Sequence, residues 1–319
     1  MVGAILSVTV LSILTGTAYM PPPAKVAAQS MAGAFVACGI EQDDVKNIPK
    51  LWKPLLVLLT SLLIANLTVG FVTWKFTPLT FLTAMLGALP GGMSDSPIIA
   101  ADMGADAGKV AILQFIRMST GIGVFPSLIL LMTKNQPADV LQYTQNQRPL
   151  HSRPKGARAI ILTLIVAFSC GAIGKLSGIP AGTLIFSMFG IITLKFLSFS
   201  VYLPMWIKRL AQVLAGAYIG CGITKTDLLE LPYLILPVCL ILIGYFLNSL
   251  LTGRLLRKLF GFPLRSAMLI ATPAGASDMA LISSDLGVED KTVIELQIIR
   301  MVVVISVFPQ IISVISALL

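Results

Sequence analysis

The stretch LPGGMSDSPIIAADMG, residues 89–104, places a Pro-Gly-Gly triplet and two aspartates between two strongly apolar runs. Pro90 lacks a backbone N–H, and Gly91 and Gly92 free the backbone to turn sharply, so a helix that reaches this point must open. In hydrocarbon each unsatisfied backbone N–H or C=O costs several kcal/mol. The stretch therefore predicts a broken helix whose free ends are surrounded by protein or by a polar cavity.

The composition of the whole chain predicts a membrane environment for this break. Of the 319 residues, 56% are hydrophobic and 12% are charged, and the mean hydropathy is +0.91. Apolar runs able to cross roughly 30 Å of hydrocarbon as helices recur along the chain. The long runs are residues 2–19, 51–74, 110–132, 157–176, 181–200, 231–251 and 293–319, and the shorter ones are 24–40, 78–103, 210–223 and 263–286. We therefore expect an all-α, polytopic membrane protein with the lipid bilayer as its first partner.

The net charge of +9 is spread over loops rather than gathered in one block. Three basic groups, at residues 134–158, 208–209 and 254–265, fall on one side of the membrane if each apolar run between 157 and 251 crosses once. By the positive-inside rule, that side is the cytoplasm. Membrane topology thus accounts for the charge, and we expect no direct nucleic-acid partner.

The broken segment occurs twice. PGGMSDSPIIAADMGADAGKVAILQFIRMSTGIGVFP, from Pro90, returns without a gap as PAGASDMALISSDLGVEDKTVIELQIIRMVVVISVFP, from Pro273, which is 183 residues later. The same offset relates AGAFVACGI, from Ala32, to AGAYIGCGI, from Ala215. We interpret the chain as two homologous helical repeats: repeat 1 at residues 1–133, a basic cytoplasmic linker at 134–156, and repeat 2 at 157–319. The helix expected at 157–176 has no counterpart in repeat 1.

Polar residues at the break are candidates for a substrate or ion site. Ser94 and Asp95 can cap the helix that restarts after the break, or they can bind a ligand, since matched breaks in two repeats are typical of mid-membrane sites in secondary transporters. Asp102 follows seven residues later, about two helical turns, which puts both acids on one face. The counterparts in repeat 2 are Ser277, Asp278 and Asp285. The helix-break residues are Pro90, Gly91, Gly92, Pro273 and Gly275.

Each repeat also carries an arginine inside an apolar run, with a glutamine three residues earlier on the same helix face. The pairs are Gln114 with Arg117, and Gln297 with Arg300. Because arginine keeps its charge, it must meet a carboxylate, a carbonyl or an anionic ligand. Three interpretations are open: a salt bridge from Arg117 to Asp102 or Asp95, binding of an anionic substrate beside the N-terminal ends of the half-helices, and a position near the lipid headgroups.

The two sites are related without being equivalent. Repeat 2 alone carries Glu295, where repeat 1 has Ile112. The position of Glu295 near a helix start predicts an exposed acid of the first turn. If its side chain faces a cavity, Glu295 is instead a candidate proton acceptor.

The arrangement of the two repeats in the membrane also has two solutions. If residues 78–103 and 263–286 cross completely, the repeats are parallel; if one element per repeat is re-entrant, they are inverted.

The repeated P-x-G-x-S-D break, the acidic D-x-G, the Q-x-x-R-M and the VFP ending resemble the AbrB family of bacterial membrane proteins, over nearly the whole chain. The family's hallmark is a duplicated membrane domain, and its members are described as regulators of gene expression or as ammonia monooxygenases. It also resembles, remotely, the cation/proton antiporter and anion transporter superfamily, in which paired repeats place broken helices at mid-membrane. The resemblance implies a bacterial inner-membrane protein.

A secondary transporter, coupled to protons or sodium and carrying a small solute that can be anionic, is the function these features favour. The sequence has no Walker motif, so nothing in it indicates transport driven by ATP. A sensor that affects gene expression through a partner protein is the alternative. An enzyme is not expected, because the sole histidine, His151, lies in the linker and oxygenase metals typically need several imidazoles. We expect no catalytic residue, no metal site and no cofactor; a homo-oligomer is compatible with the sequence.

Overall fold

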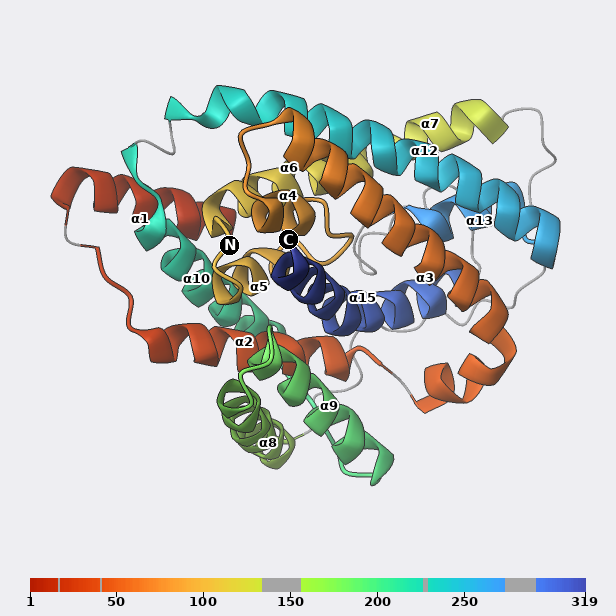
Figure 1. Ribbon diagram of the computed structural model, residues 1–319. Helices are drawn as coiled ribbons and strands as arrows, with labels where there is room; N and C mark the ends of the chain where they lie inside the picture. The colour runs from red at the N-terminus through yellow and green to blue at the C-terminus, as the bar shows by residue number, and fades with distance from the viewer. Residues whose placement is uncertain (17, 41, 134–155, 226–228, 273–290) are drawn as a thin grey trace.

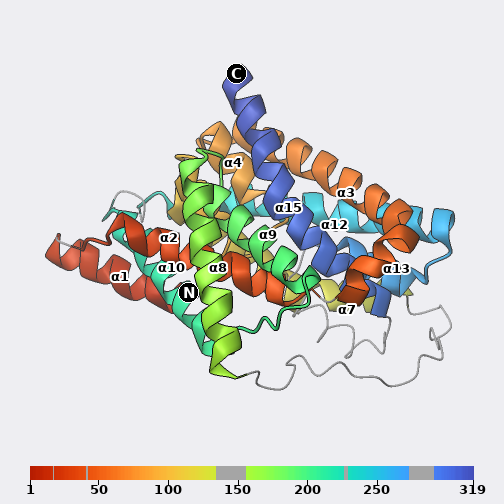
Figure 2. The same ribbon diagram turned by 90° about the horizontal axis from the view of Figure 1, so that it is seen from below.

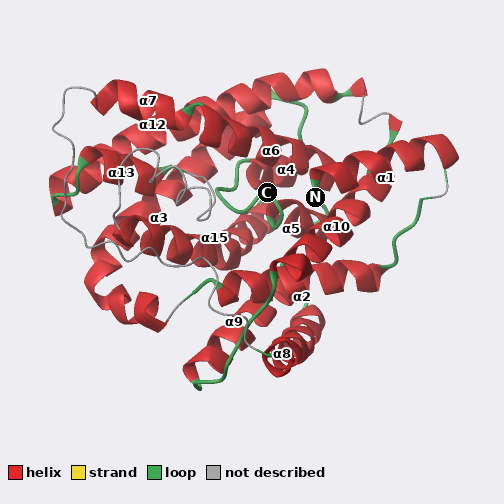
Figure 3. Ribbon diagram, turned by 180° about the vertical axis from the view of Figure 1, so that it is seen from behind, coloured by secondary structure: helices red, strands yellow, loops and turns green. Residues whose placement is uncertain are grey.

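The computed structural model describes residues 1–16, 18–40, 42–133, 156–225, 229–272 and 291–319. Every regular element in these ranges is a helix, as Figure 3 shows. The first half contains α1 Val2–Thr15, α2 Pro22–Cys38, α3 Gln42–Phe76, α4 Phe81–Gly87, α5 Ser96–Asp102, α6 Ala107–Gly123 and α7 Phe125–Thr133. The second half contains α8 Ala157–Leu176, α9 Gly182–Phe196, α10 Met205–Gly222, the 3-10 helix η1 Leu231–Leu234, α12 Ile235–Phe260, α13 Leu264–Ala271 and α15 Lys291–Leu318. The predicted all-α class is confirmed.

Four of these helical segments are long and apolar enough to cross a membrane. They are Leu51–Phe76, Ala157–Leu176, Leu231–Phe260 and Thr292–Leu318. Large apolar side chains on their outer faces, such as Ile64 and Leu251, are 65% and 67% exposed. Such side chains suit contact with lipid rather than with water.

The helices pack into two groups, and each group takes elements from both halves of the chain. In Figures 1 and 2, α1, α2, α8, α9 and α10 lie together on one side, and their principal contacts are with one another. The other group is formed by α3, α4, α5, α6, α12, α13 and α15. Contacts of α10 with α5 and α6 connect the two groups. We call them the α2 group and the α3 group.

Small residues let the helices of the α2 group approach closely. A Cβ atom on Gly33 of α2 would lie 2.3 Å from the Leu184 carbonyl oxygen of α9. A Cβ atom on Gly216 of α10 would lie 2.7 Å from the Met1 carbonyl oxygen, next to α1. Both distances are far below van der Waals contact, so only glycine permits these backbone separations.

The segment expected at 78–103 is not one helix but a hairpin. The Asp106 backbone N–H donates to Thr83 Oγ1 at 3.1 Å, so the chain that enters at the start of α4 returns beside it after α5. Gly104 supplies the turn before α6 in a left-handed conformation, with φ of 75°. At about 1.5 Å per residue, neither seven-residue helix is long enough to cross a bilayer alone.

Candidate functional site

The C-terminal end of α4 is buried, and side chains supply the donors for its free carbonyl groups. Gln114 of α6 donates from Nε2 to the carbonyls of Leu86, Gly87 and Leu89 at 3.1, 3.2 and 2.9 Å. Arg117, one helical turn later, donates to the carbonyls of Leu89 and Gly91, both at 2.7 Å. The last carbonyls of a helix have no partner within the helix, so these two residues replace the missing donors.

Two further donors reach the same half-helix from other elements. Tyr245 of α12, which is fully buried, donates its hydroxyl to the Ala88 carbonyl, and its ring lies 5.9 Å from the Arg117 guanidinium carbon. Asn66 of α3 donates to the Met85 carbonyl at 3.1 Å. The break is therefore surrounded by protein, with donors from three different helices.

The same contacts occur in the second half at the same offset. Gln297 donates to the carbonyls of Leu269, Ile270 and Thr272, and Arg300 donates to the Thr272 carbonyl at 2.8 Å. Each of these residues lies 183 positions after its partner in the first half. Ser249, which stands 183 positions after Asn66, likewise donates to the Met268 carbonyl at 3.1 Å. The repeated glutamine and arginine thus have one role in both halves.

The interpretation that Arg117 bridges Asp102 or Asp95 is wrong. The guanidinium binds backbone carbonyls and the Tyr245 ring instead, because the opened helix end offers unpaired acceptors close to α6. Its 4% exposure also contradicts a position near the headgroups. Asp102 pairs with α2: Lys25 Nζ lies 2.6 Å from its Oδ1, and Gln29 Nε2 lies 2.5 Å from its Oδ2.

Asp95 and its neighbours lie at the tip of the hairpin. Asp95 holds the N-cap position of α5 but makes no side-chain cap hydrogen bond, and Ser94 accepts a hydrogen bond from Gln212 of α10 at 3.0 Å. The predicted capping role is therefore wrong for both. Asp95 is 7% exposed, and the charge of Lys208 on α10 attracts it. The tip thus faces a helix of the α2 group.

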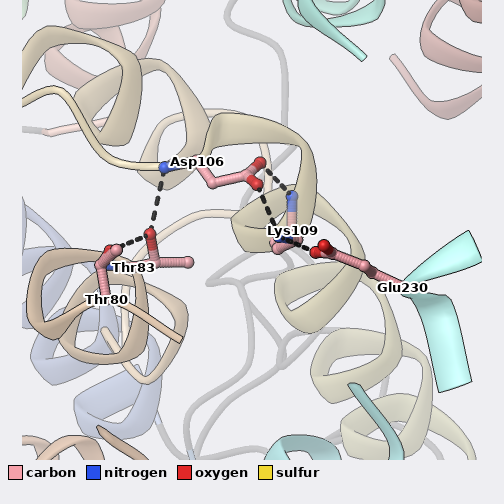
Figure 4. A network of polar contacts seen from close by, with 5 residues as sticks. All are labelled: Thr80, Thr83, Asp106, Lys109 and Glu230. Atoms are coloured by element: carbon pink, nitrogen blue, oxygen red, sulfur yellow. Dashed lines mark hydrogen bonds and ion pairs between the residues drawn. The ribbon is translucent and has the colours of Figure 1, made fainter. Parts of the chain in front are cut away.

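A polar network holds the two ends of the hairpin, as Figure 4 shows. Thr80 Oγ1 caps α4 by accepting from the Thr83 backbone N–H at 3.3 Å, and Asp106 Oδ1 caps α6 by accepting from the Lys109 backbone N–H at 3.0 Å. Lys109 Nζ also contacts Glu230 Oε2, before η1, at 2.6 Å. The hairpin base is thereby connected to the second half of the chain.

Sequence comparison now identifies the family. The family profile described as "Transition state regulatory protein AbrB" matches residues 1–316. The chain belongs to the AbrB family. "Putative regulator AbrB" of Escherichia coli (strain K12) is 25% identical over 320 residues, which cover 99% of this chain and 89% of that protein. "Uncharacterized protein YhjN" of Bacillus subtilis (strain 168) is 26% identical over 262 residues, 79% of this chain and 68% of that protein.

The second break of this AbrB-family chain lies outside the described residues. This applies to Pro273, Gly275, Ser277, Asp278 and Asp285, whose assignment to a site stays a prediction. Glu295 is described, and it is buried with 4% exposure, so the expectation of an exposed first-turn acid is wrong. Its helix packs against α3, α4 and α13.

Several site residues of this AbrB-family chain had not been predicted. Lys25 and Gln29 are four positions apart on α2, a spacing that puts both on one helix face, and this face meets Asp102. Tyr245 and Gln212 have no local signal, because only the packing of α12 and α10 against the hairpin gives them polar partners. Among the described residues, no group of histidine, cysteine or acidic side chains could hold a metal ion.

Proposed function

We propose that this protein is an ion-coupled secondary transporter for a small solute. The observation that carries the proposal is the broken hairpin, whose tip presents the buried Asp95 toward α10 across the boundary between the two helix groups. A buried acid at such a boundary is costly in a purely structural role, since intramembrane carboxylates normally line a cavity or pair with a cation.

The two helix groups provide a physical route for alternating access. Near the hairpin tip, contacts between the groups include the hydrogen bond from Gln212 to Ser94 and the attraction between Lys208 and Asp95. Ile98 of α5 also shares a buried apolar cluster with Ala215 and Ile219 of α10. A displacement of one group against the other would exchange the polar contacts and would slide the apolar surface of α5 along α10. The same displacement would open the tip to one side of the membrane and then to the other.

The hairpin favours inverted repeats. Both ends of α4–α5 lie at one end of α6, so in a membrane this element is re-entrant and does not cross. With one re-entrant element per repeat, the proposed topology places the two hairpins on opposite sides of the bilayer. The basic groups at 134–158, 208–209 and 254–265 then face the cytoplasm of a bacterial inner membrane.

The polar side chains at the break differ in whether protein groups already occupy them, and this decides which of them are candidates to bind the solute or the coupling ion. Arg117 donates to carbonyls at 2.7 Å, which leaves it poorly suited to bind an anionic substrate. Asp95 is the better candidate for coupling to protons or sodium than Asp102, whose two oxygens are already bound by Lys25 and Gln29. We propose no enzymatic activity, no cofactor and no direct nucleic-acid contact.

Transport is tested with the purified full chain in proteoliposomes. Carboxylates, amino acids and monovalent cations are added in turn, while currents are recorded on solid-supported membranes and lumenal pH is followed with pyranine. We expect at least one class to produce a current or a pH change in the wild type, and Asp95→Asn to abolish it. Folded protein that gives no solute-dependent signal with any class would contradict the proposal.

A regulator that acts through a partner protein is the second candidate, and the printed names of the family profile and of the Escherichia coli relative favour it. A transporter should move its solute when it is the only protein in the vesicle. A regulator should change gene expression in cells even when Asp95→Asn has removed any flux. Comparing transcripts of cells that carry the wild type, Asp95→Asn or no gene separates the two functions.

A further inference from the structure

The hairpin tip contains two buried oxygen groups that no donor satisfies. The Asp95 carboxylate is 7% exposed and receives no hydrogen bond or close ion pair from the described residues. Ser96, the next residue, is fully buried, and its Oγ has no hydrogen-bond partner in the same part of the chain. Buried polar groups are nearly always satisfied, so adjacent exceptions of one kind indicate a missing ligand.

The backbone of the break is shaped around these two groups. A Cβ atom on Gly92 would lie 2.4 Å from Asp95 Oδ2, and one on Gly91 would lie 2.8 Å from Ser96 Oγ. Any side chain at either glycine would therefore displace the oxygen beside it. The two glycines open the helix and also leave room for the carboxylate and the hydroxyl to fold back over the loop.

Most of the neighbouring donors are already engaged elsewhere. Both Nη atoms of Arg117 and Nε2 of Gln114 donate to carbonyls of the α4 end, and Gln212 donates to Ser94. Arg117 Nε has no hydrogen-bond partner among the described residues. The Lys208 ammonium lies 4.5 Å from the centre of the Phe35 ring, where a cation–π contact holds it, and it makes no ion pair with Asp95 within the described residues. The tip thus offers acceptors to a ligand and few donors.

We propose that the Asp95 carboxylate and Ser96 Oγ bind a small monovalent cation at the hairpin tip. Carboxylate and hydroxyl oxygens are ligands for hard cations, and a single carboxylate balances a single positive charge. An anion would be repelled by Asp95. The inference rests on the proposed transporter for its biological meaning, since this cation would be the coupling ion, but binding is measurable without transport.

The test measures binding to the full chain in detergent at constant pH and ionic strength. NaCl, KCl or NH4Cl replaces choline chloride, and the rise in apparent Tm gives a half-saturating concentration for each ion. We expect one of the three ions to stabilise the wild type in a saturable way and Asp95→Asn to lose the response. Ser96→Ala should raise the half-saturating concentration roughly tenfold, because one ligand oxygen is removed.

Three further variants separate a binding site from a general effect on folding. Asp106→Asn and Ser187→Ala remove an acid and a buried hydroxyl at other places, and their cation response should match the wild type. Lys208→Gln should lower the half-saturating concentration roughly three- to tenfold, because it removes a positive charge that repels the bound ion. A purely structural role of Asp95 predicts no such fall in the half-saturating cation concentration.

The outcomes are decisive in both directions. A wild type whose stability follows pH but ignores all three cations would overturn the site, and so would a cation response that survives in both Asp95→Asn and Ser96→Ala. Transport that runs on protons without any cation requirement would overturn the site while leaving the transporter standing. Cation binding without any solute flux would leave the cation site standing and overturn the proposed transporter.

Discussion

Arg117 illustrates how a charged residue can be buried in this protein without a carboxylate. Its guanidinium replaces the donors that the break removes from α4, and hydrogen bonds to a charged group contribute about 1.5–3 kcal/mol each. The pairing with Gln114 three positions earlier lets one face of α6 satisfy a whole helix end. The sequence could indicate that Arg117 needed a partner, but not that the partner was backbone.

The first prediction concerns this arginine. Arg117→Ala should lower the free energy of unfolding by about 3 kcal/mol, because the Gly91 carbonyl loses its donor and the Leu89 carbonyl loses one of two. Arg117→Lys should recover only part of the loss, because an ammonium keeps the positive charge but cannot donate in the planar fork of a guanidinium. Thermal unfolding in detergent measures both. Arg209→Ala, at an exposed position of α10, is the control and should stay within about 0.5 kcal/mol. Equal losses at the two positions would contradict this account.

At the scale of elements, the apolar runs predicted most helices well. The run at 157–176 coincides with α8, and the run at 24–40 lies within two residues of α2. The break at Pro90 was also predicted, since proline and glycine act through the local backbone. The reversal of the chain after the break was left open, because it depends on contacts such as Asp106 with Thr83, which no local pattern encodes.

A second prediction concerns the contact between α2 and α9. Gly33→Ala should destabilise the protein by about 1–3 kcal/mol, because the new methyl group would meet a backbone oxygen that cannot move alone. Gly123→Ala is the matched control: it lies in α6 with no atom within 4 Å of the added Cβ, and it should be neutral or stabilising by about 0.5–1 kcal/mol. Chemical or thermal unfolding of the two variants compares them directly. A tolerated Gly33→Ala would show that α2 and α9 are not held at this separation.

At the scale of the whole molecule, both halves of the chain contribute helices to both helix groups. The first half supplies α2 to one group and α3 to the other, and the second half supplies α10 and α12 in the same way. Composition and repeats could predict two related units but not this exchange, which depends on long-range packing. Because each helix group needs helices from both halves, the molecule cannot be divided at residues 134–156 into two independently packed domains.

A third prediction tests the inverted topology. Lys75 and Arg254 are exposed residues in the C-terminal parts of α3 and α12, the two helices that the 183-residue offset relates, with Lys75 aligned to Lys258. In a background without Cys38, Cys170, Cys221 and Cys239, Lys75→Cys should react with a membrane-impermeant maleimide in intact cells. Arg254→Cys should react only after permeabilisation. Labelling of both from the same side would mean parallel repeats.

The contacts at the end of α4 also constrain how the chain can be made. The carbonyls of Leu86 and Leu89 receive their donor from Gln114, which is synthesised 28 and 25 residues later. Asn66 of α3 reaches the Met85 carbonyl earlier, but until α6 has emerged the Gly87 and Leu89 carbonyls lack the donors that Gln114 and Arg117 supply, so α4 cannot settle in hydrocarbon alone. The hairpin must therefore enter the bilayer together with α6, and its insertion waits for a helix that comes after it in the chain.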